Sequence, residues 1–172
     1  MERYLFVIDY QNDFVDGALG FPGAEKLDGA IAAKVRAYGK GKVLFTRDTH
    51  FADYMDTQEG KNLPVPHCIK DTDGWRIRRE LDALRKTPPI DKITFGSKDL
   101  VDILKGEPSI ESITFVGLCT DICVISNVML TKAFFPEIPL IVDAKACAGV
   151  TPESHQNALA AMKMCQVRIV NE

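Results

Sequence analysis

The sequence predicts an α/β fold of three layers, α/β/α, in which helices cover both faces of a central, mostly parallel sheet. Short apolar runs rich in Val, Ile and Phe recur without polar alternation, which is typical of strands covered on both faces. Segments with the apolar spacing of helices lie between them. Alternating strands and helices favour parallel pairing through right-handed crossovers. In such folds ligands bind beyond the carboxyl ends of the strands.

Six apolar runs are predicted as strands. The third is the least regular, because Pro88 and Pro89 precede it and proline cannot donate a backbone hydrogen bond to a sheet. The other five are bounded by turn signals. The six predicted strands are 4–8, 42–46, 90–95, 113–116, 139–142 and 167–170.

Helices are predicted where apolar residues recur every three or four positions. This spacing places helices at 27–38, 77–84 and 100–104. A further helix follows the segment "GLCTDICV" and continues through "ISNVMLTKAFF". The last helix begins with Thr151 as N-cap, Pro152 in the first helical position and Ser154 in the first turn.

Length and composition indicate one globular domain spanning residues 1–172, with 46% hydrophobic and 26% charged residues. A net charge of −3 without a cluster of Lys and Arg argues against nucleic acid or an anionic membrane as partner, and favours a small-molecule substrate. No apolar run approaches the about 18 residues of a membrane span, so a cytoplasmic location is expected. The sequence is compatible with a monomer or a homo-oligomer.

The segment after the fourth predicted strand carries the candidate nucleophile. With Thr120 or Asp121 as N-cap, Cys123 lies in the first helical turn, where free N–H groups and the helix dipole favour the thiolate. A lone cysteine in a cytoplasmic protein is more often a small buried hydrophobe. A disulfide or redox pair with Cys119 is a further alternative, although the spacing is C-x-x-x-C and not C-x-x-C. The count of five cysteines is odd and favours free thiols.

Two other strand ends carry groups that can activate a thiol. Asp9 ends the first predicted strand, and Lys92 lies in the third. A carboxylate that faces a lysine can relay a proton while it keeps the lysine charged. The alternative is an exposed charge at a strand end for Asp9 and an ordinary solvated lysine for Lys92.

Asp48 and His50 follow the second strand in "TRDTH", and His67 lies in the proline-framed "LPVPHC". Residues two apart at a strand end point to the same side. Two histidines beside a carboxylate form a plausible ligand set for a divalent metal with open positions. The alternative is a pair of loop histidines with ordinary hydrogen bonds. The third histidine, His155, is expected to face solvent or to cap the last helix.

As a set, these residues resemble the cysteine-hydrolase branch of the isochorismatase-like superfamily, most closely its nicotinamidase members. "VIDYQNDF" is similar to the family's D-x-Q-x-D-F, "TRDTH" and "LPVPHC" to its D-x-H and P-P-H-C elements, and "VGLCTDICV" to its G-x-x-T-D-x-C-V turn. The resemblance covers nearly the whole chain and implies an isochorismatase-like fold. It also implies a catalytic triad, a metal-ligand set and an oxyanion hole built from backbone N–H groups at a cis peptide bond, Leu118–Cys119. The implied triad is Asp9, Lys92 and Cys123, the implied metal ligands are Asp48, His50 and His67, and the implied oxyanion donors are Cys119 and Cys123.

The chain departs from the family pattern in three places. Position 56, where some members have a further histidine ligand, is Asp, which makes Glu59 the candidate for a fourth ligand. The aromatic residue that precedes P-P-H in many nicotinamidases is absent here, because this segment has Leu63 and Pro64 instead. Phe14 therefore remains as the candidate for stacking on the substrate ring. The segment after Lys92 is shorter than usual and affects one wall of the pocket.

The resemblance implies a metal-containing cysteine amidohydrolase that converts nicotinamide to nicotinate and ammonia through a thioester. Zinc is the first expectation for the metal, with iron or manganese next. The alternative within the enzyme class is a hydrolase of another small amide or ureido compound with the same triad. The alternative outside it is a metal-binding or thiol redox module.

Overall fold

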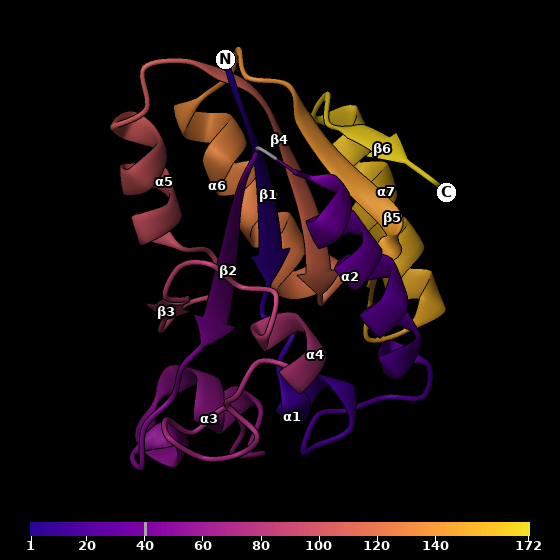
Figure 1. The fold of residues 1–172 in the computed structure, drawn as a ribbon. Helices are drawn as coiled ribbons and strands as arrows, with labels where there is room; N and C mark the ends of the chain where they lie inside the picture. The colour runs from indigo at the N-terminus through magenta and orange to yellow at the C-terminus, as the bar shows by residue number, and fades with distance from the viewer. Residues whose placement is uncertain (40) are drawn as a thin grey trace.

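The computed structural model describes residues 1–39 and 41–172 and has at its centre a six-stranded sheet of order β3-β2-β1-β4-β5-β6 (Figure 1). All five strand pairings are parallel, which confirms the predicted α/β class. The strands are β1 (Glu2–Ile8), β2 (Lys42–Asp48), β3 (Ile90–Lys92), β4 (Ile110–Leu118), β5 (Leu140–Ala148) and β6 (Arg168–Val170).

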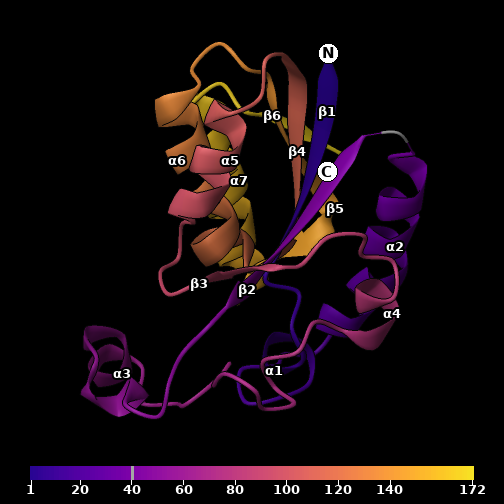
Figure 2. The same ribbon diagram turned by 60° about the vertical axis from the view of Figure 1, so that its left-hand side comes forward.

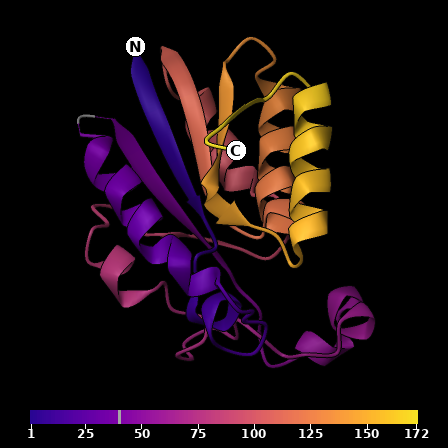
Figure 3. The same cartoon turned by 90° about the vertical axis from the view of Figure 1, so that its right-hand side faces the viewer.

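Helices cover both faces of this sheet, as Figures 2 and 3 show. α2 and α4 lie on one face, and α5, α6 and α7 lie on the other. The α-helices are α1 (Asn12–Val15), α2 (Leu27–Ala37), α3 (Gln58–Asn62), α4 (Arg79–Asp82), α5 (Lys98–Lys105), α6 (Ile125–Phe134) and α7 (Pro152–Met164). Three short helical turns complete the elements: η1 (Ala24–Lys26), η2 (Tyr54–Asp56) and η3 (Thr120–Val124).

The side chains of β1 alternate between two apolar cores, because successive strand residues point to opposite faces. Leu5 and Val7 pack in the core under α2, whereas Tyr4, Phe6 and Ile8 pack in the core under α5, α6 and α7. Burial on both faces explains why this strand has no polar alternation.

Two predicted elements are shorter than the sequence suggested. The third strand ends at Lys92 and not at 95, because its ladder with β2 pairs only Thr46, Arg47 and Asp48. The helix predicted at 77–84 is limited to Arg79–Asp82, since Ile77 instead forms an isolated bridge with Gln11. The N-terminus of α7 is as predicted: the Thr151 side chain accepts a hydrogen bond from the Ser154 N–H, and Pro152 follows as the first helical residue.

The chain changes direction at β1. It adds β2 and β3 on one side of β1, and β4, β5 and β6 on the other. The crevice beyond the carboxyl ends of β1 and β4 is therefore a topological switch point, where open parallel sheets bind ligands. In Figures 2 and 3 the segment with α3 lies apart from the helical layers, beyond the carboxyl ends of the strands.

Gly117 allows β4 to run closely beside β1 just before the cysteine-containing turn. Its φ is 114°, in the region that favours glycine. A Cβ atom at this position would lie 2.1 Å from the carbonyl oxygen of Ile8. No helix in the described ranges, 1–39 and 41–172, is long and apolar enough to cross a membrane.

Candidate active site

Asp9, Lys92 and Cys123 come together at the carboxyl ends of β1, β3 and β4, the three residues that the resemblance grouped. The Lys92 Nζ lies 2.5 Å from Asp9 Oδ2 and 3.6 Å from Cys123 Sγ. All three side chains are buried. Thr46 of β2 donates from its hydroxyl to Asp9 Oδ1 at 2.6 Å, so the carboxylate is held from two sides. Asp9 itself has a φ of 42°, a value uncommon outside glycine and often found at functional sites.

Burial and charge act in opposite directions within this cluster. Burial raises the pKa of Asp9, and the Lys92 charge opposes the shift only partly. Burial alone would lower the pKa of Lys92, but the charges of Asp9, Cys123 and Asp48 outweigh it and raise this pKa. Lys92 is therefore a permanent cation between Asp9 and the thiol.

The cysteine-containing turn differs from the prediction in two ways. The N-cap is Cys119, not Thr120 or Asp121, because the helix opens with the π-type turn η3, in which Val124 N–H donates to the Cys119 carbonyl. Burial raises the pKa of Cys123 well above its ordinary value, and Lys92 offsets this only in part. The helix start alone therefore does not produce a thiolate here, and a nearby base has to accept the proton.

Cys119 and Cys123 both line the cavity described below, and the peptide bond Leu118–Cys119 is cis, as the resemblance implied. Neither cysteine is in a disulfide. Burial raises the pKa of Cys119 to about 12, and the charges of Asp121 and Asp9 add to the shift. The Cys119 side chain is thus an unreactive thiol in this environment.

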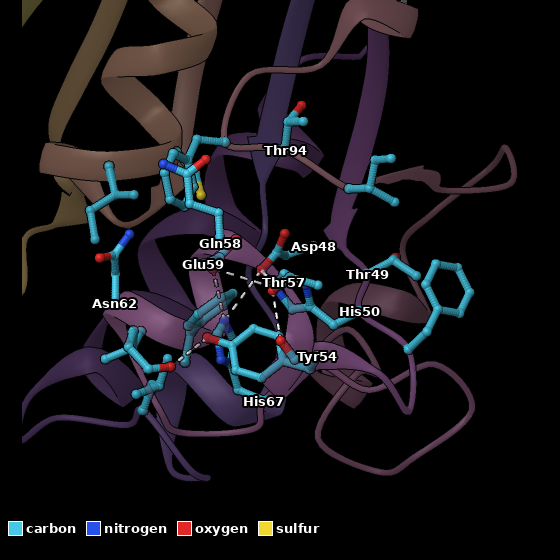
Figure 4. Close-up of a pocket in the computed structure, with 18 of the residues that line it drawn as sticks. Asp48, Thr49, His50, Tyr54, Thr57, Gln58, Glu59, Asn62, His67 and Thr94 are labelled. Atoms are coloured by element: carbon cyan, nitrogen blue, oxygen red, sulfur yellow. Dashed lines mark hydrogen bonds and ion pairs between the residues drawn. The ribbon is translucent and has the colours of Figure 1, made fainter.

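The second cluster is a candidate metal site made by Asp48, His50, Glu59 and His67, which Figure 4 shows turned toward one another. His50 Nε2 lies 3.0 Å from Asp48 Oδ2 and 3.5 Å from Glu59 Oε1. His67 Nε2 lies 3.5 Å from the same Asp48 oxygen and 3.7 Å from the same Glu59 oxygen. One atom of each residue therefore faces a common point.

These four residues fit a divalent transition metal. Bonds of about 2.0–2.2 Å to one ion place donor atoms about 3–3.5 Å apart, close to the separations observed. His67 Nδ1 donates to the Val65 carbonyl at 2.8 Å, so Nε2, which faces the cluster, is the ring nitrogen that could bind a metal. Burial alone would raise the pKa of Asp48, but hydrogen bonds from His50 and His67 and the Lys92 charge lower it below its usual range. The carboxylate is therefore ready to act as a ligand.

Glu59 reaches this cluster through the local structure of α3. The Thr57 hydroxyl caps the helix by accepting from the Gly60 N–H at 3.0 Å. The Tyr54 hydroxyl donates to the Leu63 carbonyl at 2.8 Å, and its ring lies 4.7 Å from the His50 ring, centroid to centroid. Tyr54 thereby holds the C-terminal end of α3 close to the His50 ring.

Gln11 holds Asp48 in place and was not singled out from the sequence. Its Oε1 accepts from the Asp48 N–H at 2.7 Å, while its Nε2 donates to the carbonyls of Asp48 and Trp75 at 2.9 and 2.8 Å. The side chain is fully buried, so all three of these bonds are shielded from water.

Gln11→Leu is expected to lower the free energy of unfolding by about 3 kcal/mol or more, because it leaves three buried backbone groups unpaired at about 1–3 kcal/mol each. Urea denaturation followed by the fluorescence of Trp75 measures the change. Gln156→Leu, at an exposed position of α7, is the matched control and should change stability by less than about 0.5 kcal/mol. Equal losses in the two variants would contradict the role of Gln11.

Both clusters reach one cavity of about 800 Å³, the first of them through Cys123 alone, because Asp9 and Lys92 are buried and do not line it. Cys123, Asp48, His50, Glu59 and His67 all line it, and Thr94 lies across it from His67 in Figure 4. Phe14, the predicted stacking residue, is in the lining as well, with its ring centroid 5.5 Å from that of His67. The cavity therefore places a thiol, a metal-ligand set and an aromatic ring around one space.

Two further residues hold the turn of Cys123 and were missed or misjudged from the sequence. Asn127 donates to the Cys123 carbonyl at 2.8 Å; its polar side chain within the apolar run "ISNVML" was the available signal. His155 does not face solvent as expected: it is half-buried, and its Nδ1 lies 2.8 Å from the Thr120 hydroxyl. Its partner lies 35 positions away, so the contact has no local signature.

Comparisons with known proteins found relatives similar to this chain in sequence and in fold. Residues 3–171 match the model of the Isochorismatase domain. The chain is 29% identical to an uncharacterized isochorismatase family protein PncA of Bacillus subtilis (strain 168), across 93% of each protein. The crystal structure of nicotinamidase/pyrazinamidase PncA from Bacillus subtilis is similar with a TM-score of 0.86 and 29% identity, covering 99% of this chain and 100% of that one. That of pyrazinamidase/nicotinamidase from Streptococcus mutans UA159 is similar with a TM-score of 0.84 and 27% identity, covering 98% and 100%.

Proposed function

The chain belongs to the isochorismatase family, and on that premise we propose that it is a metal-containing cysteine amidohydrolase that converts nicotinamide to nicotinate and ammonia. The observation that carries the proposal is the single cavity lined by Cys123 and by four candidate metal-ligating side chains, with Lys92 in contact with both the thiol and the buried Asp9. Similar proteins described as nicotinamidase or pyrazinamidase support the substrate class. The proposal treats residues 1–172 as one catalytic domain, supported by the family match over 3–171.

In the first half of the reaction, Asp9 accepts the proton of Cys123 and the sulfur attacks the carboxamide carbon. The raised pKa of Cys123 makes this base necessary, and the raised pKa of Asp9 suits it to accept and return a proton. Lys92 stays charged and stabilises the thiolate as it forms. The backbone N–H groups of Cys119 and Cys123 hold the oxyanion, and the proton on Asp9 leaves with ammonia.

In the second half, Asp9 takes a proton from water, and the resulting hydroxide attacks the thioester carbon. The C–S bond breaks, nicotinate is released, and the sulfur recovers a proton from Asp9. The same carboxylate thus serves as base and acid in turn, which its fixed position between Thr46 and Lys92 permits.

Asp48, His50, His67 and Glu59 would hold the metal, for which zinc is the first expectation and iron or manganese the alternatives. When bound, the ion would act as a template that orients the pyridine ring by its nitrogen, directly or through a bound water. Phe14 flanks the same space and provides an apolar face for the ring. The ring is thereby presented with its carboxamide toward Cys123.

A coupled ammonia assay over nicotinamide, pyrazinamide and short aliphatic amides tests the proposal. Nicotinamide and pyrazinamide are expected to release ammonia, whereas aliphatic amides, which lack a ring nitrogen for the metal, are expected to be poor substrates. If only aliphatic amides or ureido compounds are hydrolysed, the triad is retained but the proposed substrate changes from nicotinamide to one of these compounds. No ammonia from any amide, together with reversible oxidation of Cys119 with Cys123, would support a redox module instead.

We further place the enzyme in the cytoplasm and in pyridine nucleotide salvage. All five cysteines are free thiols, which suits a reducing compartment. Nicotinate, the expected product, is a precursor that such a salvage route consumes.

A further inference from the structure

The outer part of the active-site cavity has a different character from its inner part. Inside lie Cys123 and the metal-ligating side chains, whereas exposed apolar side chains line the outer part together with the polar side chains of Asp53, Gln58 and Asn62. Several of these remain largely open to solvent: Ile93 is 68% exposed, Phe51 50%, Phe95 45% and Leu63 39%. Exposed apolar side chains that gather in one concave place mark a binding site for an apolar group.

The size of the cavity also indicates a ligand larger than nicotinamide. Cavities of about 300–1,000 Å³ accommodate drug-sized molecules. A volume of about 800 Å³ lies in the upper part of that range, whereas nicotinamide is one ring with a carboxamide. A single-ring amide held between Cys123 and the metal ligands therefore leaves the apolar outer part unfilled.

The exposed side chains of the segment 93–95 stand on a backbone that is fixed to the catalytic residues. Lys92 Nζ donates to the Thr94 carbonyl at 3.0 Å. Asn127 donates to the Phe95 carbonyl at 3.0 Å and also to the Cys123 carbonyl at 2.8 Å. The Ser97 N–H in turn donates to Asn127 Oδ1 at 2.8 Å. Ile93 and Phe95 thus form a wall at a set position relative to the thiol.

We infer that the site takes aromatic carboxamides that carry an apolar extension on the ring, such as a fused second ring, and that Ile93 and Phe95 bind this extension. The inference rests on the proposed amide hydrolysis and defines its substrate class more closely. The thiol and the metal ligands act on the amide and the ring, while the wall recognises the part of the substrate beyond them. Covering Ile93 and Phe95 removes apolar surface from water, which favours the extended substrate.

Steady-state kinetics with nicotinamide and quinoline-3-carboxamide test the inference on the metal-loaded protein. The kcat/KM for quinoline-3-carboxamide is expected to equal or exceed that for nicotinamide. Phe95→Ala should lower the ratio of the two kcat/KM values by about tenfold, since one methylene in an apolar pocket is worth at least that much. Ile93→Ala should lower the same ratio. This second variant tests the wall independently if Phe95→Ala fails to fold.

Phe134→Ala is the matched control, because Phe134 is 53% exposed on α6 and does not line the cavity. It should leave the ratio unchanged. If nicotinamide is hydrolysed but the kcat/KM for quinoline-3-carboxamide is less than about a tenth of the kcat/KM for nicotinamide, the inference is overturned and the proposed function stays intact. A changed oligomeric state in Phe95→Ala with an unchanged ratio would assign the wall to a protein interface and also overturn it. Inactivity toward both amides would reject the proposed function together with the inference.

Discussion

Cys123→Ala is expected to lower kcat for nicotinamide hydrolysis by about 10⁴-fold or more, because it removes the thiol that Lys92 contacts, and burial keeps the other thiol of the cavity, Cys119, protonated. Asp9 and Lys92 remain in place in this variant, but they have no nucleophile to activate. Ammonia release measures kcat, and mass spectrometry of the quenched wild-type protein should detect the acylated Cys123. The variant should fold normally, since it loses only one small buried side-chain atom.

Cys119→Ala is the matched control for this loss. The proposed role of position 119 uses only its backbone N–H, and its thiol is kept protonated by burial, which raises its pKa to about 12. Activity within a few fold of the wild type is expected. If both alanine variants lose activity to the same extent, the division of labour between the two cysteines is wrong and the redox-pair interpretation gains support.

Removal of the metal by prolonged chelation is expected to lower nicotinamide hydrolysis by about 10²-fold or more, since a misplaced ring costs that much in rate. Alkylation of Cys123 by iodoacetamide should continue at a similar rate, because Asp9 and Lys92 activate the thiol. Asp48 lies 3.4 Å from Lys92 Nζ, so a change of a few fold in the alkylation rate is compatible with this expectation. Elemental analysis before and after chelation identifies the metal, and its re-addition should restore hydrolysis.

His67→Ala should reproduce the effect of chelation and also lower the bound metal measured by elemental analysis. Asp56→Asn, at an exposed position in η2 outside the ligand set, is the matched control and should retain both metal and activity. Unchanged nicotinamide turnover after complete loss of metal would make the ion incidental. The proposal of a thiol-dependent amidase would then remain, but with a substrate other than nicotinamide.

The family resemblance, drawn from sequence motifs, predicted more of the candidate site than the local apolar patterns predicted of the element boundaries. Apolar period and turn signals predicted the six strands and the last helix, but they overestimated the strand at 90–95 and the helix at 77–84. Both errors have one cause: a local pattern does not reveal whether a pairing partner continues alongside. β2 offers β3 only three residues, and Ile77 pairs with Gln11 across the chain.

The sequence by itself determined that Asp9, Asp48 and Cys123 would lie near one edge of the sheet, because parallel strands bring their carboxyl ends together there and each of these residues follows such an end. The resemblance added Lys92, which the predicted strand 90–95 placed inside a strand; the structure ends that strand at Lys92. Only the tertiary structure decided that Glu59 joins the histidines, that Asn127 ties the wall at 93–95 to Cys123, and that burial raises the pKa of that thiol. These features depend on contacts between distant parts of the chain and on the exclusion of water, and neither leaves a periodic trace in the order of residues.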